Sequence, residues 1–253
     1  MKHLYDNIIS DATITLSGAS PITGSSVENV RKDNASYALI TDAVTVQYLK
    51  FSFSAATTIE AIHIENTSLT PTDTLVLETS NDDFSTTIDT IAITPRLHSR
   101  LYVGGNYVRE NRYYAYYVGT LTKQYYRLKM IQAAGTGIKT GEIYIASSVY
   151  EDVRNYNGDH YRGRLKKWIF RDGEDGVIYR KLRSSAFKLE GSYSRMSDTQ
   201  EEILDDIATN DYTVILPDLT DSEAFYGTIT MTDPYRHDNT NYFSIDFRFL
   251  ESV

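Results

Sequence analysis

The sequence predicts a mainly β protein with two β-rich regions, and three observations carry that prediction. The chain has 21 Tyr among its 253 residues, and aromatic side chains suit the half-buried surface of a sheet. Apolar and polar residues alternate over short segments that end in turn-forming residues, which is the pattern of strands. A strong helix signal occurs at residues 198–209 alone. We therefore expect β-sandwiches, with one α-helix in the second region.

The first region holds a series of predicted strands before residue 147. Their short length and regular spacing are typical of a sandwich. Turn-forming residues separate them, as in NTSLTPTD and NDDFST, and the runs RYYAYYVG and QYYRLKMIQ predict a closing pair of strands. The predicted strands cover residues 44–53, 59–64, 75–80, 87–93, 112–119, 124–132 and 141–146.

A polar stretch, SSVYEDVRNYNGDHYRG, separates the two regions. It places a first domain at 1–150, a linker at 151–163 and a second domain at 164–253. Beyond the linker, LKKWIFRD and VIYRKL flank the DGEDG turn, which predicts a β-hairpin. Further strands are expected at residues 185–194, 212–217, 223–231 and 241–251.

The predicted helix belongs to this second domain. The motif S-x-x-Q begins at Ser197 and is a capping box, which predicts a helix from Asp198 to about Thr209. One face of that helix is apolar, so we expect it to pack on the sheet. The residues of this face are Ile203, Leu204 and Ile207.

Composition and charge exclude several classes of protein. The net charge of −9 does not suit a general nucleic-acid binder, which needs a basic surface. The charge is uneven, because residues 151–195 hold 11 basic and 7 acidic side chains whereas residues 196–253 hold 2 and 13. The absence of Cys excludes disulfides, a thiol nucleophile and cysteine-bound zinc. No apolar run is long enough for a membrane span and no signal peptide is recognised, so we expect no membrane partner.

The sequence also lacks the motifs of common enzymes. Nucleotide-binding, metalloprotease and serine-hydrolase patterns are missing. Glu174 and Asp175 are neighbours on a hairpin tip, where their side chains point apart, and the five His suggest no Ser-His-Asp set. We therefore expect no enzyme, no catalytic residue and no cofactor. His63 lies between Ile62 and Ile64 on a predicted strand, so we expect it to face solvent or a loop.

Two groups of residues could still bind a ligand. Asp73, Asp82 and Asp83 could hold Ca²⁺ in sandwich loops, but we favour polar turns in which Asp bonds its own backbone, so no metal is expected. Clustered tyrosines could stack on sugar rings or form a subunit contact, although such residues are more often half-buried in a sheet. The tyrosine candidates are Tyr113, Tyr114, Tyr116 and Tyr117.

The first domain resembles a discoidin or galactose-binding jelly roll over about residues 25–148. The resemblance rests on YLKFSF, IEAIHIENTS, LVLETSNDDFST, YYRLKM and GEIYIA, in this order. It implies a jelly-roll β-sandwich that binds sugars, lipids or proteins through loops at one end. A carbohydrate-binding module for host-surface or cell-wall glycans is therefore one reading of the function.

The second domain is similar to the sandwich-plus-helix unit of tailed-phage tube and baseplate proteins, including distal tail proteins. The similarity rests on FKLEGSYSRMSDTQEEILDDI, VILPD, FYGTITM and FSIDFRFLE over about residues 165–253. It implies a structural tail component of the virion, assembled in the host cytoplasm as a ring, with a hexamer as the family expectation. The implied partners are copies of itself and tube, tape-measure or baseplate proteins, with DNA only as passing cargo. This is the main reading, in which the first domain decorates the outside of the ring.

The uneven charge predicts which residues would line the channel of such a ring and which would contact a neighbouring subunit. An acidic lining would repel DNA and let it slide, so Asp205, Asp206 and Asp246 are candidates to face a channel. Basic residues before the helix would contact the acidic segment of a neighbouring subunit. The candidates for that contact are Lys166, Lys167, Arg180 and Arg183. The alternative for each is an ordinary solvated surface.

Overall fold

The computed structural model of the chain describes most of its residues. It leaves out residues 33–36, 44, 87, 98–100, 104–105, 109–112, 133–135, 152–160, 173–177, 211, 218–223, 233–234, 237–242 and 252–253. Only the backbone is described at 101–103, 106–108, 161–172, 178–187, 195, 235–236 and 243.

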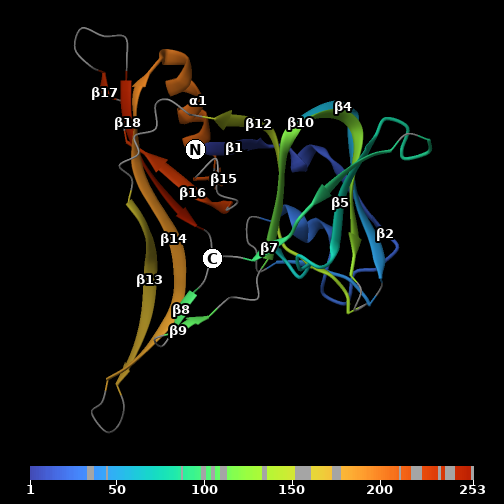
Figure 1. The fold of residues 1–253 in the computed structure, drawn as a ribbon, viewed down its shortest axis with the longest axis horizontal. Helices are drawn as coiled ribbons and strands as arrows, with labels where there is room; N and C mark the ends of the chain where they lie inside the picture. Colours follow the sequence, from blue (N-terminus) through green and yellow to red (C-terminus); the bar gives the residue numbers. More distant parts are fainter. Residues whose placement is uncertain are drawn as a thin grey trace. The chain divides into compact units, whose positions relative to one another are not determined.

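The protein is mainly β, as the sequence predicts, and the described residues include one α-helix, α1 (Asp198–Thr209) (Figure 1). The chain forms two compact units, which we name for their content. The sandwich unit comprises residues 4–100 and 109–149, and the helix-bearing unit comprises residues 1–3, 101–108 and 150–253. Two short segments that the prediction assigns to the first domain therefore belong to the helix-bearing unit. The predicted linker lies mostly outside the described residues.

Two long strands, β4 (Val46–Thr67) and β10 (Tyr113–Ile131), organise the sandwich unit. Each strand bends and contributes one half to each of two layers. In the first layer the order is β2–β4–β10–β5–β6, and in the second it is β12–β4–β10–β7, with all pairs antiparallel. The other elements of this unit are η1 (Ile9–Asp11), β2 (Thr13–Ser17), η2 (Val27–Arg31), β3 (Leu39–Ile40), β5 (Thr74–Ser80), β6 (Asp89–Ile93), β7 (Arg96–Leu97), β11 (Lys139–Thr140) and β12 (Ile143–Glu151). Strand β1 (Lys2–Asn7) begins in the helix-bearing unit and ends in this one.

The predicted closing pair of strands is wrong, because both runs belong to β10. Residues 46–53 and 59–64 are likewise parts of one strand, β4. The sequence suggested separate strands because polar residues interrupt the alternation where each long strand bends. The pairing of β10 with β4 shifts register at two places in the bend, between Val118 and Leu121 and between Lys123 and Tyr125.

Tyr126 holds this bend from inside. Its side chain is fully buried, and its Oη lies 2.6 Å from the carbonyl oxygen of Thr57 and 3.0 Å from that of Leu121. The same hydroxyl accepts a hydrogen bond from the Lys123 amide at 2.8 Å, and burial raises the pKa of Tyr126 to about 12. The tyrosine thereby satisfies backbone groups that the bend removes from the ladder.

The core of the sandwich unit follows the period-two alternation of the strands. In the first half of β4, Leu49, Phe51 and Phe53 point into the core, while the residues between them lie on the outer face. Strand β10 does the same with Leu128 and Met130. The alternation predicted for VTVQYLKFSF is thus confirmed in β4, and the outer face of the layer is the one that carries polar and aromatic side chains.

The helix-bearing unit is built on one antiparallel sheet with the order β13–β14–β18–β16–β15. The hairpin of β13 (Tyr161–Asp172) and β14 (Ile178–Met196) is as predicted, although its DGEDG turn lies outside the described residues. Segment 185–194 is not a separate strand, because β14 runs from Ile178 to Met196 and includes it. The remaining strands are β8 (Leu101–Val103), β9 (Asn106–Val108), β15 (Thr213–Leu216), β16 (Phe225–Met231), β17 (Tyr235–Arg236) and β18 (Phe243–Glu251).

Helix α1 begins at the predicted capping box. The Ser197 hydroxyl accepts a hydrogen bond from the Gln200 amide, and the Gln200 side chain accepts one from the Ser197 amide. Leu204 and Ile207 are fully buried, whereas Ile203 is half-buried at the edge of the apolar face. The predicted docking of the helix is therefore confirmed. No helix in the described part of the chain is long and apolar enough to cross a membrane.

The inner face of this sheet is aromatic, as the alternation in β18 predicts. Ile245, Phe247 and Phe249 are buried, and Tyr193 of β14 packs on Phe247. The Tyr193 hydroxyl lies 2.5 Å from Nε2 of His3, which is fully buried. Burial lowers the pKa of His3 to about 3, so the imidazole is neutral near pH 7.

Candidate binding surfaces

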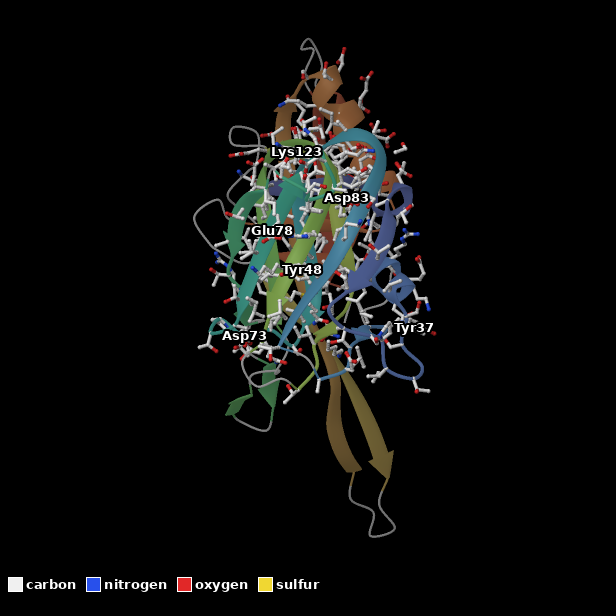
Figure 2. The ribbon with its side chains drawn as sticks, turned by 90° about the vertical axis from the view of Figure 1, so that its right-hand side faces the viewer. Tyr37, Tyr48, Asp73, Glu78, Asp83 and Lys123 are labelled. Atoms are coloured by element: carbon white, nitrogen blue, oxygen red, sulfur yellow. The ribbon has the colours of Figure 1, made fainter. Side chains whose placement is uncertain are left out.

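The outer face of the first layer gathers aromatic and charged side chains from β4, β5 and β10 (Figure 2). Cross-strand pairing aligns them, because Arg127 lies opposite Lys50 on one side and Glu78 on the other. We call this area the Arg127 surface. Its residues are Tyr48, Lys50, Glu78, Asp83, Phe84, Tyr125, Arg127 and Lys129.

Arg127 is held on several sides at once. Its Nε donates to Oε2 of Glu78 at 2.5 Å, and the Glu78 side chain is only 7% exposed. Its Cζ lies 4.7 Å from the ring centre of Tyr48 and 4.0 Å from that of Phe84. The guanidinium therefore has a buried counter-ion at Nε and lies over two aromatic rings at the distance of cation–π contacts.

The loop after β5 places Phe84 in this position. Asp82 organises the loop, since its carboxylate accepts hydrogen bonds from the Ser80 hydroxyl and from the amides of Ser85 and Thr86. Hydrogen bonds from the Ser80 and Thr86 side chains are the main cause of an Asp82 pKa lowered to about 2. The loop therefore keeps a negative charge at its centre over the whole physiological range.

Phe84 itself adopts an unfavourable backbone conformation. Its φ is +63° and that of Asp83 is +55°, values that cost a non-glycine residue roughly 1 kcal/mol each. Asp83 also forms an ion pair with Nζ of Lys50 at 2.8 Å, and Asn81 accepts a hydrogen bond from the Gln124 amide at 3.1 Å. These contacts hold the loop across the sheet, so the strained turn delivers a ring to Arg127.

The same contacts show how the loop aspartates are engaged. Asp82 bonds its own turn, and Asp73 accepts hydrogen bonds from the amide and hydroxyl of Thr70 at 2.8 Å. Asp83 is engaged with Lys50. The polar-turn interpretation is thus confirmed for Asp73 and Asp82. Within the described ranges, no group of three His, Asp or Glu side chains could hold a metal ion.

The four tyrosine candidates lie together at the start of β10, outside the Arg127 surface. Tyr114 is 2% exposed, which leaves no face for a sugar, and its ring stacks on Tyr116 at 6.4 Å. Tyr113, Tyr116 and Tyr117 are half-buried, and Cζ of Arg96 lies 5.2 Å from the Tyr116 ring centre. A ligand or subunit contact stays a prediction for these three.

The prediction that His63 faces solvent or a loop is wrong. His63 is fully buried, and its Nε2 lies 3.0 Å from Oε2 of Glu65, which is 1% exposed. The ring also lies 6.0 Å from that of Tyr114. Alternation with Ile62 and Ile64 correctly places His63 on the opposite face of β4, but sequence periodicity does not show that this face is covered as well.

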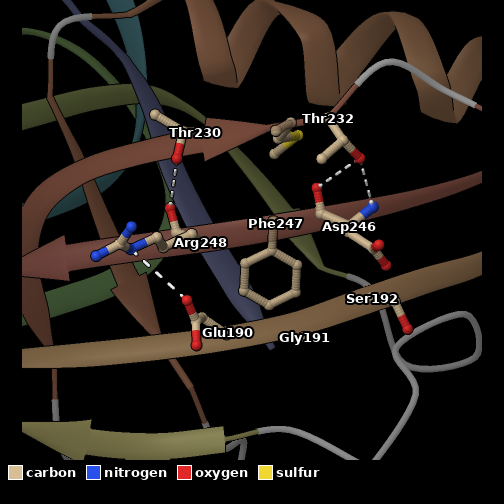
Figure 3. Close-up of a pocket in the computed structure, with 9 residues that line it drawn as sticks. Glu190, Gly191, Ser192, Thr230, Thr232, Asp246, Phe247 and Arg248 are labelled. Carbon is tan, nitrogen blue, oxygen red and sulfur yellow. Dashed lines mark hydrogen bonds and ion pairs between the residues drawn. The ribbon is translucent and has the colours of Figure 1, made fainter.

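The outer face of the helix-bearing unit's sheet also carries a groove of about 600 Å³, to which we assign no ligand (Figure 3). The groove crosses β14, β18 and β16, and its ion pairs are open to solvent. Arg248 is 51% exposed and its Nε lies 3.6 Å from Oε1 of Glu190, which also pairs with Lys188 at 2.7 Å. The lining residues are Glu190, Gly191, Ser192, Thr230, Met231, Thr232, Asp246, Phe247 and Arg248.

The candidate residues of the ring are only partly described. Asp205, Asp206 and Asp246 are exposed, which suits both a channel lining and an ordinary surface. The four basic candidates lie on β13 and β14, where only the backbone is described. Ring formation and tail partners stay predictions, with no supporting observation in the described part of the chain.

Comparison with known proteins adds the following findings. No family model and no curated protein matches the chain. Among similar solved structures is a mutant of chitosan-binding module 1 from a chitosanase/glucanase of Paenibacillus sp. IK-5, with 12% identity over 57% of this chain and 98% of that one and a TM-score of 0.39. Another is CpGH89CBM32-6 of Clostridium perfringens, with 18% identity over 56% and 100% of the two chains and a TM-score of 0.40. A third is CBM32-1 from a family 31 glycoside hydrolase of the same organism, with 11% identity over 56% and 98% and a TM-score of 0.40. Values this low carry no argument about function.

Sequence analysis did not single out the Arg127 surface. The signal was present, since the alternation in VTVQYLKFSF and QYYRLKMIQ places Tyr48, Lys50, Arg127 and Lys129 on the polar side of their strands. The alternation does not show that these two runs pair with each other, because the register of that pairing depends on the bends in β4 and β10. The contribution of Phe84 could not be foreseen, since it rests on a positive φ that sequence patterns do not predict for Phe.

Proposed function

We propose that the sandwich unit is a carbohydrate-binding module and that a sugar binds on the Arg127 surface. The observation that carries the proposal is the fixed guanidinium of Arg127. Its side chain forms no hydrogen bond other than that to Glu78 within the described residues, so both terminal nitrogens are available to a ligand. A donor group held in place before binding lowers the ordering cost of the complex.

The chemistry around Arg127 suits a sugar. Sugar rings have C–H faces that pack on aromatic side chains, and their hydroxyl groups need a few well-placed polar partners. Tyr48, Phe84 and Tyr125 supply half-buried rings, while Arg127 and Lys50 supply donors. The proposed site lies on a sheet face with one loop folded over it, rather than on the loops at one end that the jelly-roll resemblance implies.

Affinity electrophoresis of the full chain tests the proposal. Native gels would contain a panel of soluble neutral and acidic polysaccharides, and we expect at least one of them to slow the protein. Arg127→Ala should weaken that retardation about tenfold, the loss of roughly one charge-assisted hydrogen-bonding group.

The matched control is Arg248→Ala. Arg248 has the corresponding position on the middle strand of the other sheet, so its loss removes the same charge without touching the Arg127 surface. Its retardation should equal that of the parent protein. Absence of retardation by every polysaccharide, or equal loss in both variants, would contradict the proposal.

A further inference from the structure

We infer that the sugar bound by the Arg127 surface is acidic and that its carboxylate pairs with the two terminal nitrogens of Arg127. This inference rests on the proposed function and adds the class of ligand. It follows from the charge balance of the surface, from the one open edge of the guanidinium and from the kind of acceptor that fits that edge.

The charge balance favours an anion. Glu78 is the shared partner of two cations, since Arg127 lies at 2.5 Å and Lys129 at 4.0 Å from its two oxygens. Lys50 and Asp83 neutralise each other at 2.8 Å. Among the residues of the surface, three cations therefore face two carboxylates. Asp82 of the adjoining loop is a third carboxylate, but its oxygens accept hydrogen bonds from its own turn, so Arg127 and Lys129 share the single carboxylate of Glu78.

The geometry leaves one side of Arg127 for a ligand. Its Cζ lies over the rings of Tyr48 and Phe84, and its Nε is taken by Glu78. The remaining edge carries Nη1 and Nη2, which only donate hydrogen bonds. Because the side chain is 21% exposed, that edge is within reach of solvent and hence of a ligand.

A carboxylate is the sugar group that fits this edge best. Its two oxygens accept two parallel N–H bonds from a guanidinium, and such paired, charged hydrogen bonds are roughly twice as strong as neutral ones. A hydroxyl group accepts at a single oxygen and brings no charge. Because the Arg127 side chain is only 21% exposed, its attraction for an anion is screened less than at an open surface.

The test compares one polymer in two forms, polygalacturonate and its carboxyl-reduced product, by isothermal titration with the full chain. We expect the acidic form to bind about tenfold more tightly, and we expect that preference to shrink as NaCl rises. Arg127→Lys keeps the charge and the partner Glu78 but loses the fork, so it should bind the acidic form about tenfold more weakly and lose most of the preference. Arg248→Lys is the control, and unchanged melting temperatures would show that both variants fold.

Each outcome decides between the two claims. Equal binding of both forms would overturn the acidic specificity and leave the carbohydrate-binding proposal in place. Wild-type affinity in Arg127→Lys would also overturn it, because the fork would then be unnecessary. Tighter binding of a sulfated but carboxyl-free polysaccharide, such as dextran sulfate, would show that charge rather than the carboxylate is recognised. If no polysaccharide binds in any form, both claims fail.

Discussion

Arg127 and Arg248 have equivalent positions in two different sheets, yet their surroundings differ. Each lies on the outer face of a strand with neighbours on both sides, directly opposite a glutamate. In the sandwich unit the distance from Arg Nε to Glu oxygen is 2.5 Å and the arginine is 21% exposed. In the helix-bearing unit the corresponding values are 3.6 Å and 51%.

Cross-strand pairing alone therefore does not fix a charged side chain. Arg248 has its glutamate but no aromatic ring is recorded against it in the described part of the chain, and Glu190 is shared with Lys188 in solvent. Arg127 has the rings of Tyr48 and Phe84 and a buried partner. An exposed pair of this kind contributes little, whereas a restrained one can act as a preformed binding group.

The sheet of the helix-bearing unit needs a buried inner face as firm as that of the sandwich unit, and a charge placed under it should cause a large loss of stability. Leu204→Asp places a charge where a fully buried side chain packs, so the free energy of unfolding should fall by about 4 kcal/mol. Ser197→Ala, which removes only the cap of the same helix, should cost about 1 kcal/mol. Urea unfolding followed by circular dichroism measures both, and equal small losses would show that the helix does not support the sheet.

A smaller effect separates the two glutamates. Glu78→Ala should lower the free energy of unfolding by about 1–2 kcal/mol, because it leaves Arg127 and Lys129 without their partly buried acceptor. Glu190→Ala removes an exposed partner and should cost less than about 0.5 kcal/mol. Thermal unfolding of the two variants measures both losses of stability, and equal losses would mean that the two arginines are restrained to the same degree.

A still smaller change is expected in the stability of the protein at acid pH, through the pKa of Asp82. Hydrogen bonds to the folded loop hold the pKa of Asp82 at about 2 rather than 3.8, so the unfolded state binds more protons between these values. The contribution of Asp82 is therefore present above pH 4 and is lost as the pH falls toward 2. Asp82→Asn should show a shallower loss of stability across that window than the parent protein. Parallel curves for the two proteins would indicate that Asp82 does not organise the loop that carries Phe84.

Much of the fold could be predicted because burial follows periodicity. The alternation in β18 and the capping box at Ser197 depend on neighbouring residues, and both appear as expected. The long strands β4 and β10 could not be predicted, because their bends are held by the Tyr126 hydroxyl and by backbone groups far apart in the sequence. The burial of His63 was missed for a related reason, since it depends on what covers the second face of β4.

The candidate site was harder to foresee than the fold. Its charged residues come from three strands whose register is set by those bends. Phe84 comes from a turn in which Asp82 stabilises a backbone conformation that Phe disfavours. Clusters of Tyr are more conspicuous in the sequence, but Tyr114 is used in packing. An abundant residue type is therefore a weaker guide to the site in this protein than residues that lie on the same side of paired strands.

The most direct test of the account is a nitrogen-15 spectrum of the arginine side chains of the full chain, recorded while trigalacturonate is added. The Nε–H signal of Arg127 is assigned by its loss in Arg127→Lys, and that of Arg248 by its loss in Arg248→Lys. We expect the Arg127 signal to move and saturate with added sugar while the Arg248 signal stays in place. A stationary Arg127 signal, with or without movement elsewhere, would contradict the claim that this arginine holds the ligand.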